Sequence, residues 1–378
     1  MDPLFIPLCT FYVLCALTLI QVFYYLYFFS RTAFFKNPDP ARPAREHQPV
    51  SVIICARDES RNLTEKLPAV LNQQYEGPYE IIVINDNSFD DTKFVLERIC
   101  DRHPRLKVVE LVQEAKFITG KKFPLSMGIK TAKNDLLLLT DADCAPASPL
   151  WMEKMQGAYR PGTEVVLGYG PYEKRSGLLN KIIRFETFHT ALQYFSFAAA
   201  GLPYMGVGRN LSYKKDLFFR NKGFSAHNHI PSGDDDLFVN AVATGTNTRI
   251  VLDKDTFVYS APKTTWSSWL RQKQRHYTTS KYYKPLHKFL LGLYSGSHFL
   301  YYPALAAALV FTPAPFRVFI WPVFGLRFLL QAVIFYGSMS KLKEGDLFWL
   351  FPLFDLWGFI YYLIFAPALW RRPRTKWK

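Results

Sequence analysis

The sequence contains few cysteines, and none of them is spaced as a zinc site or a redox pair. The five are Cys9, Cys15, Cys55, Cys100 and Cys144. Their number is odd, no two form a C-x-x-C motif, and two of them lie in an apolar N-terminal run. We therefore expect no disulfide framework, and a reducing compartment for the hydrophilic part of the chain.

Acidic residues are the scarcer class of charged residue. The 378 residues include 31 acidic and 46 basic side chains, which gives a net charge of +15. A basic excess favours phosphate-bearing ligands or membrane surfaces as partners and does not choose between them. No internal repeat is visible, so the length allows one large domain or two small ones with added segments.

Charge is absent altogether from residues 3–30. A membrane-spanning helix needs about 20 apolar residues, so this run is long enough to cross a bilayer. A cleaved signal peptide is the alternative, but the run is too long, no basic residue precedes it and no A-x-A site follows it. We expect a retained transmembrane anchor over residues 1–30 and a Pro-rich linker over 31–49. The linker carries cations that predict a cytoplasmic location for the next segment: Arg31, Lys36, Arg42 and Arg45.

Residues 50–262 are predicted to form one α/β domain. Four short apolar runs have the composition of strands covered on both faces, at 50–56, 79–85, 106–111 and 135–141. The segments between these runs have helical spacing. Because strand–helix alternation is typical of a parallel sheet, we expect a mostly parallel central sheet.

The remainder of the chain has interfacial and then apolar character. Residues 263–288 mix Trp and Tyr with Lys and Arg, as an amphipathic segment at a membrane interface does. Three apolar blocks, each interrupted by Pro, Gly or a charge, follow at 289–311, 316–339 and 347–370. We expect two to three membrane spans over residues 289–370 and a basic tail over 371–378.

Two charges lie inside these blocks, Arg327 in the second and Asp355 in the third. A lone charge at mid-bilayer costs roughly 2.5–3.5 kcal/mol on insertion scales. The polar turn at 341–346 predicts antiparallel packing of the two blocks, so we expect the charges to pair. The alternative is that Arg327 binds a lipid phosphate and Asp355 bonds elsewhere. Three full spans would carry the basic tail out of the cytoplasm, so we expect block 289–311 to be re-entrant or interfacial.

Asp141 and Asp143 follow directly on the fourth apolar run. Ligands of parallel α/β sheets bind beyond the carboxyl ends of the strands. Hard cations such as Mg²⁺ bind carboxylate and phosphate oxygens together. A D-x-D tripeptide alone is a weak signal, because loops are rich in aspartate. Further polar clusters accompany it at 83–92, 120–128, 231–239 and 271–277.

In this order the clusters resemble the motifs of the inverting, membrane-bound family 2 glycosyltransferases, which have a GT-A fold. The resemblance covers about residues 48–290. It implies that Asp86 contacts the nucleotide base, usually uracil, and that Lys121 approaches the nucleotide. It further implies that Asp141 and Asp143 bind Mn²⁺ or Mg²⁺ together with the donor diphosphate. We also expect three residues at and just after the end of the first strand to contribute to the donor site, namely Ala56, Arg57 and Glu59.

The same resemblance assigns the catalytic chemistry. The general base falls on the run Asp234-Asp235-Asp236, within which Asp235 is the expected base, and residues 205–218 form the acceptor-side segment before it. A carboxylate at hydrogen-bond distance takes the proton of the attacking hydroxyl. Gln272 and Arg275 fall on a motif of the donor site, where a guanidinium and a metal would stabilise the departing diphosphate.

The sequence departs from the family's motifs at several positions. Asn85 and Asn87 replace an acid and a glycine of the first motif, and Pro124 and Ser126 replace Ala and Asn of the second. His276 stands where processive polymerases have the tryptophan that caps the acceptor site. This last departure disfavours the polymerase subgroup.

Simpler interpretations of the polar clusters stay open from the sequence. Residues 86–88 could merely form a turn, with Asp90 capping the next helix. The run 234–236 could be a solvated loop, and residues 271–284 a basic stretch that lies on anionic lipid.

Three functions follow from these observations. The first is transfer of a sugar, from a UDP-sugar by expectation, to a lipid or lipid-linked acceptor at the cytoplasmic face of the inner (plasma) membrane. The second is a processive polysaccharide synthase, and the third an inactive scaffold. The intact acids argue against a scaffold, while four apolar segments and His276 favour a single transfer. The expected partners are the nucleotide sugar, the lipid and the membrane, with no nucleic acid.

Overall fold

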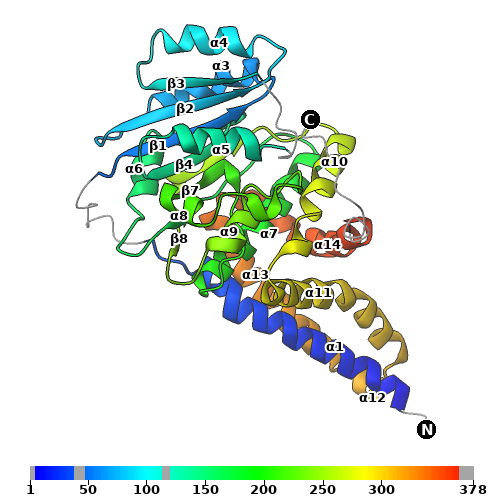
Figure 1. Cartoon of the computed structure of the whole chain (residues 1–378). Helices are drawn as coiled ribbons and strands as arrows, with labels where there is room; N and C mark the ends of the chain where they lie inside the picture. The colour runs from blue at the N-terminus through cyan, green and yellow to red at the C-terminus, as the bar shows by residue number, and fades with distance from the viewer. Residues whose placement is uncertain (1–4, 38–46, 113–119, 366–378) are drawn as a thin grey trace.

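The computed structural model describes residues 5–37, 47–112 and 120–365. Figure 1 shows a sheet-containing domain from which long helices project to one side. The domain is built on a seven-stranded sheet of order β3-β2-β1-β4-β7-β6-β8. The predicted fold class, a mostly parallel α/β domain with apolar helices toward both ends of the chain, is confirmed.

The first four strands are parallel and lie where the apolar runs predicted them. They are β1 (Val50–Ala56), β2 (Tyr79–Asp86), β3 (Leu106–Leu111) and β4 (Leu136–Asp141). The crossover helices between them are α3 (Ser60–Leu71), α4 (Thr92–Cys100) and α5 (Lys122–Thr131). In the register Cys55 lies beside Asp141, and Ala56 beside Asn85. The polar residues that end these strands therefore meet at one edge of the sheet.

The second half of the domain is made of shorter elements. β7 (Leu211–Lys214) runs antiparallel to β4 and is followed across the sheet by β6 (Val165–Leu167) and β8 (Thr248–Ile250). β5 (Cys144–Pro146) and β9 (Val258–Ser260) form a separate antiparallel pair. The helices of this half are α6 (Trp151–Gln156), α7 (Leu178–Ala199), α8 (Lys215–Arg220), α9 (Asp236–Val242) and α10 (Trp266–Tyr277).

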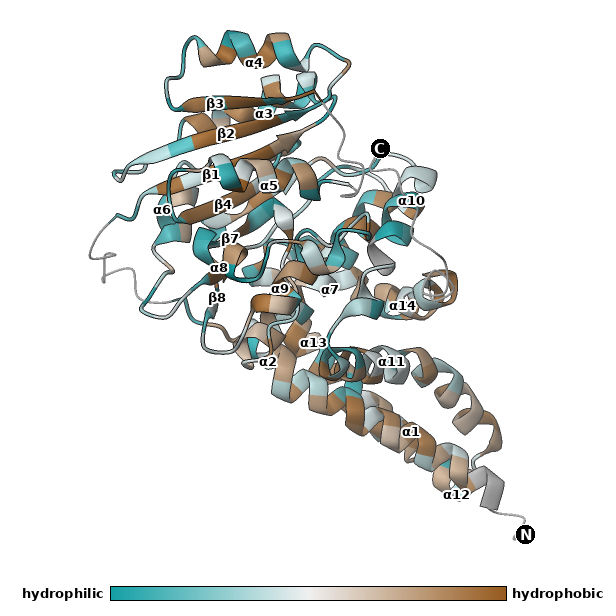
Figure 2. Ribbon diagram, viewed as in Figure 1, coloured by the Kyte–Doolittle hydropathy of each residue, from teal (hydrophilic) through white to brown (hydrophobic). Residues whose placement is uncertain are grey.

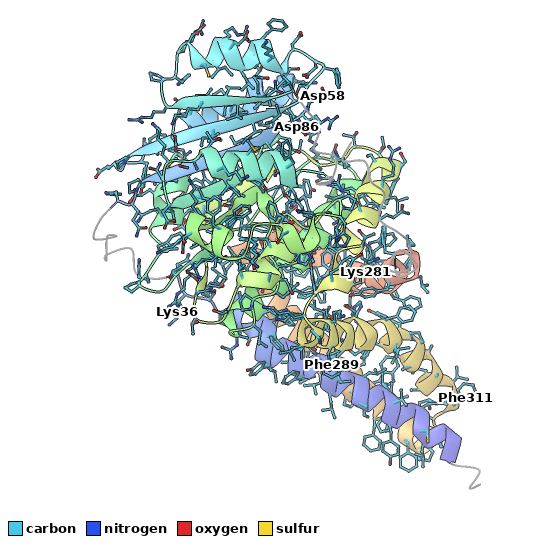
Figure 3. The ribbon with its side chains drawn as sticks, in the orientation of Figure 1. Lys36, Asp58, Asp86, Lys281, Phe289 and Phe311 are labelled. Atoms are coloured by element: carbon cyan, nitrogen blue, oxygen red, sulfur yellow. The ribbon has the colours of Figure 1, made fainter. Side chains whose placement is uncertain are left out.

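Helices with exposed apolar surface form the projecting part of the molecule (Figure 2). They are α1 (Phe5–Phe23), α11 (Pro285–Phe311), α12 (Ala314–Arg317) and α13 (Ile320–Lys341). Among the described residues three helical stretches are long and apolar enough to cross a membrane: Leu8–Ala33, Ala314–Lys341 and Gly345–Phe365. Figure 3 marks Phe289 and Phe311 toward the two ends of α11, and both side chains are exposed. Apolar surface of this extent on neighbouring helices indicates membrane association.

The N-terminal helix packs directly on the sheet-containing domain. α1 continues through a π-helical turn (Tyr24–Phe29) into α2 (Ser30–Ala33). The Thr32 hydroxyl lies 2.7 Å from that of Ser196 on α7, and the ring of Phe28 stacks on that of Phe197 at 4.3 Å. The first residues of the predicted linker, 31–33, are therefore helical and packed on the domain core. Residues 38–46 of that linker lie outside the described residues, as does the basic tail.

The predicted pairing of the two buried charges is confirmed. Arg327 donates from Nη1 and Nη2 to the carboxylate of Asp355, at 2.9 and 3.1 Å. The same carboxylate accepts from His298 at 2.8 Å, from Gln331 at 2.6 Å and from Tyr302. Because every donor comes from α11 or α13, one acid of the last helix ties three helices together.

That last helix, α14 (Phe351–Phe365), begins and ends against the catalytic domain. Just before it, Glu344 accepts from Arg184 of α7 at 2.9 Å. Near the end of α14 the Tyr361 hydroxyl donates to Glu186, which lies within one turn of Arg184 on α7. The ring of Phe365 meets that of Trp269 on α10 edge-on, with 5.6 Å between the centroids. Figure 1 accordingly shows α14 beside α10, apart from the end of the α1–α11 pair.

Candidate active site

A cavity of about 2040 Å³ opens at the carboxyl edge of β1 and β4. Its lining includes most of the predicted site residues: Arg57, Glu59, Lys121, Asp141, Asp143, Asp234, Asp235, Asp236, Gln272 and Arg275. Ala56 is fully buried within β1 and Asp86 is buried at the end of β2, and neither lines the cavity. Residues that are far apart in the sequence therefore share one space.

Asp141 and Asp143 provide a cluster of oxygen ligands. One ligand atom from each, together with Cys144 Sγ, lies within 4.8 Å of the others. Asp141 accepts a charged hydrogen bond from Lys121, and Asp143 accepts from Ser260 Oγ at 3.2 Å. Burial raises the pKa of Asp141, but the charges of Lys121 and Arg209 outweigh it and hold that pKa below its ordinary value.

Asp143 has the opposite balance. Burial, and then the charge of Asp141, raise its pKa above the ordinary value of an aspartate. A divalent cation between the two carboxylates would remove this repulsion, because each oxygen then faces a positive charge. The cluster thus has the composition and electrostatics of a site for Mg²⁺ or Mn²⁺.

The lysine pair after Gly120 is held by backbone geometry. Gly120 has φ +70°, and an added Cβ would lie 2.2 Å from the carbonyl oxygen of Pro231, so only glycine fits here. Lys122, which sequence reasoning missed, is fully buried and donates to the carbonyls of His227, Ile230 and Ser232 at 2.6 to 2.7 Å. Lys121 therefore pairs with Asp141, while Lys122 holds the loop that leads to the acidic run Asp234–Asp236.

Asp235 is the member of the acidic run whose environment suits a general base. It lies at the N-terminus of α9, where it accepts from the backbone N–H of Gly208 at 2.7 Å and of Asp236 at 2.8 Å. Burial, followed by the charges of Asp234 and Asp236, raises its pKa to about 7. A base with a pKa near the working pH is both available and strong enough to take a proton.

The neighbours of Asp235 have different environments. Asp236 is buried and accepts from the hydroxyls of Thr279 and Tyr283, so it fastens α9 to the segment before α11. This excludes a solvated loop at Asp236. Asp234 lines the cavity and adds negative charge beside Lys121 and Asp235.

The donor-side residues divide into those at the cavity and those behind it. Arg57 lines the cavity and lies 3.7 Å from the carboxylate of Asp86. Gln272 donates to the hydroxyl of Tyr172 at 3.2 Å. Asp90 accepts from the backbone N–H groups of Ser60 and Thr92, but the N-cap of α4 is Asp91, so the expectation that Asp90 caps this helix is wrong by one residue. The side chain of His276 lies outside the described part of the chain.

Arg209 is a further candidate site residue that sequence reasoning did not single out. Its guanidinium stacks over the ring of Tyr172 at 4.3 Å and lines the cavity near Asp143. The buried Nη1 atom has no hydrogen-bond partner among the described residues. A lone arginine inside residues 205–218 gave no separate signal, because no spacing marks it. This unpaired N–H group suits an oxygen of a diphosphate, because a cation held by Asp141 and Asp143 would keep a diphosphate close to Arg209.

The chain matches two family descriptions in known proteins. Residues 51–218 match Glycosyl transferase family 2, and residues 164–369 match Glycosyl transferase family group 2. Together the two matches cover the sheet, the cavity and the C-terminal helices.

Individual relatives are similar over part of their length. An uncharacterized glycosyltransferase of Haemophilus influenzae is 27% identical over 200 residues, which are 51% of this chain and 60% of that protein. A beta-monoglucosyldiacylglycerol synthase of Nostoc sp. is 27% identical over 117 residues, 29% of this chain and 25% of that protein. The matched parts are less than two thirds of either relative.

A solved structure has the same fold over nearly the whole chain. The mannosyltransferase PcManGT from Pyrobaculum calidifontis, in complex with GDP-Man and Mn²⁺, superposes with a TM-score of 0.58 at 20% identity. The superposition covers 93% of this chain and 99% of that one. The likeness therefore includes the membrane-associated helices as well as the sheet.

Proposed function

The chain belongs to glycosyl transferase family group 2, and on this premise we propose that it transfers one sugar from a nucleotide sugar to a lipid or lipid-linked acceptor, with inversion and with a divalent metal. A UDP-sugar is the expected donor. One observation carries the proposal: a single cavity joins the acidic cluster at the sheet to the apolar helices. A donor and a membrane-borne acceptor have access to the same acids there.

Asp235 acts as the base in this scheme. The acceptor hydroxyl attacks the anomeric carbon of the donor sugar, and its proton passes to the Asp235 carboxylate. A new carbon–oxygen bond forms as the bond between that carbon and the diphosphate oxygen breaks. The electron pair of the broken bond leaves with the nucleoside diphosphate. Attack opposite to the leaving group inverts the anomeric centre and needs no covalent enzyme intermediate.

Cations around the cavity stabilise the leaving group. Arg209, Arg275 and Lys121 lie where negative charge gathers on the departing diphosphate. Asp141 and Asp143 would hold a divalent cation, which supplies further positive charge to phosphate oxygens. We propose that Arg57 and Glu59 contact the donor. Asp86, which does not line the cavity, would act by holding the Arg57 guanidinium in position.

The packing of the helices supports transfer of a single sugar over polymer synthesis. Tyr301, Arg327 and Gln331 are at most 1% exposed. The Arg327 guanidinium stacks over the Tyr301 ring at 4.2 Å, so these side chains fill the centre of the projecting helices. A synthase that exports its polymer needs an open path between these helices, where the side chains now lie. The Nostoc relative is named for a reaction on a diacylglycerol lipid, which agrees with a lipid acceptor.

We propose the cytoplasmic face of the inner (plasma) membrane as the site of the reaction. Arg31 and Lys36 follow the apolar part of the first helix, on the side where α2 meets the catalytic domain. Lys281, marked in Figure 3, lies between the domain and the projecting helices. Cations in such positions favour the cytoplasmic side.

The test is radiolabelled transfer by the purified full-length protein from a panel of UDP- and GDP-sugars into a membrane lipid extract, with Mg²⁺ or Mn²⁺. We expect label in the organic phase from one donor, loss of signal with a chelator, and an inverted anomeric linkage in the product. The proposal would be refuted if the protein showed no transfer and no donor hydrolysis with any donor in the panel. A long water-soluble polymer as the product would favour a synthase.

A further inference from the structure

The cavity continues past the catalytic acids into an arm between α7, α11 and α14. Six apolar side chains line this arm: Phe185, Leu291, Phe299, Phe335, Phe354 and Leu363. Polar side chains of α7 line it as well, and two of them, Glu186 and His189, are hydrogen-bonded to Trp269 and Tyr294. The acids and cations described above lie at the other end of the same space. The arm therefore offers apolar surface that is continuous with the catalytic site.

One face of α11 is left free along the arm. Gly292 and Gly296, four residues apart and hence on one face of the helix, both line the cavity. A Cβ added at either position would meet no other described atom within 4 Å. Glycine inside a helix costs about 1 kcal/mol relative to alanine. A local reason is therefore needed for two of them on this face.

Close helix packing, the usual reason for such glycines, does not apply to this pair. It does apply elsewhere in the chain. A Cβ at Gly358 of α14 would lie 2.5 Å from the His298 ring, and one at Gly337 of α13 would lie 3.2 Å from the Ala33 carbonyl oxygen. At Gly292 and Gly296 the space opposite the helix is cavity instead.

The far end of the arm is polar, and His298 Nδ1, Arg327 Nε and Gln331 Oε1 have no hydrogen-bond partner there among the described residues. His298 and Asp355 line it there, and the Asp355 carboxylate accepts from Arg327, Gln331 and His298. A hydrocarbon chain has no reason to enter this cluster, so the arm has a definite end. A growing sugar chain would require an exit beyond this end, whereas the apolar side chains of the arm suit hydrocarbon.

We propose that the arm holds the hydrocarbon chain of the acceptor lipid while its hydroxyl lies at Asp235, and that Gly292 and Gly296 set the width available to this chain. This inference rests on the proposed function and adds to it the acceptor-binding site and two specificity-determining residues. The glycines act by leaving room, so larger side chains should exclude the lipid without affecting the donor.

The test compares Gly292→Leu and Gly296→Leu with Gly325→Leu in the full-length protein in nanodiscs. Gly325, on α13, is the matched control, since an added Cβ also meets no described atom within 4 Å but the residue does not line the cavity. Transfer into lipid and hydrolysis of the donor by water are measured in parallel. We expect the first two variants to lose at least tenfold in transfer, with donor hydrolysis within twofold of wild type and Gly325→Leu unaffected.

A second measurement does not depend on turnover. A diacylglycerol that carries a diazirine in one chain is photo-crosslinked to each protein, and the labelled peptides are mapped by mass spectrometry. We expect labels on α11 and α14 in the wild type and at least a fivefold loss of them in Gly296→Leu. Wild-type transfer by both leucine variants, or labels on other helices only, would overturn the inference. A wild type that neither transfers sugar nor hydrolyses donor would instead refute the proposed function, and the crosslinks would still report on the arm.

Discussion

Replacement of Asp235 by asparagine tests the proposed base most directly. The amide is nearly isosteric, and one oxygen can still accept from the Gly208 N–H, which lies 2.7 Å from the carboxylate. It cannot take a proton from the acceptor hydroxyl. Loss of a general base costs about 10²- to 10⁴-fold in rate. We expect Asp235→Asn to lose this much in kcat for transfer while its affinity for the donor stays unchanged.

The dependence of the transfer rate on pH tests the role of Asp235 as the base a second time. The wild-type rate should follow the ionised fraction of Asp235, whose pKa is raised to about 7 by burial and by Asp234 and Asp236. About half of it is ionised at pH 7 and about 1% at pH 5, so the rate should fall about 50-fold between them. This limb should vanish in Asp235→Asn. In Asp234→Asn it should move to lower pH, because one repelling charge has been removed.

Stability should change in the opposite direction to activity. Since the folded-state pKa of Asp235 lies above the ordinary value of an aspartate, the folded protein holds a proton that the unfolded chain releases, and stability falls as pH rises toward 7. Asp235→Asn should therefore raise the melting temperature at pH 8 but not at pH 4. Wild-type turnover and an unchanged acid limb in Asp235→Asn, with an inactive Asp234→Asn, would show that the base is misassigned.

Three further outcomes are expected. Asp143→Ala should abolish metal-dependent binding of the donor in titration calorimetry with Mn²⁺, since a hard-cation ligand is lost; metal-stimulated transfer at the wild-type level would contradict the site. Arg209→Lys should lower kcat about 10²-fold, since an ammonium cannot keep both the stacking contact and a bidentate contact to phosphate; unchanged kcat with a raised KM would indicate ground-state binding only. Arg327→Leu should lower the free energy of unfolding in detergent by about 3–5 kcal/mol, and adding Asp355→Leu should recover part of it, because a single change leaves one buried charge unpaired; a double variant less stable than both single ones would exclude this reason.

Much of the sheet was predictable because its strands are buried on both faces. β1, β2 and β4 are nearly continuous apolar runs, and β2 and β4 end in polar residues that the parallel arrangement brings together, so Asp141 and Asp143 could be found from sequence. The three-residue strands β6 and β8 gave no comparable pattern. β6 pairs with β7 and β8 pairs with β6, and no local sequence encodes these partners.

Residues whose role depends on tertiary contacts were missed. Lys122 reads as the second half of a surface lysine pair, yet it is buried by a loop about a hundred residues later in the chain. Arg209 carries no motif of its own. The Arg327–Asp355 pair was predictable from physics alone, because a charge inside an apolar segment requires a partner at similar depth.

The attachment of α14 at both ends has a consequence for how the chain is threaded. A helix of 15 residues is about 22 Å long, less than the roughly 30 Å of a hydrocarbon core. Glu344, which precedes the helix, and Tyr361, in its second half, contact Arg184 and Glu186 on a single turn of α7. The stretch Gly345–Phe365 has the length and composition of a membrane span, but two contacts with a single turn of α7 suit a helix that lies along the domain at the membrane surface. We therefore predict that α14 is interfacial and that the 27-residue α11, which packs along α1, crosses in its place, although α11 is not among the described stretches that are apolar enough to span. With α1, α11 and α13 as the crossings, Phe365 would lie on the side of the catalytic domain, and the expected re-entrant block at 289–311 would not be needed to satisfy the charge rule.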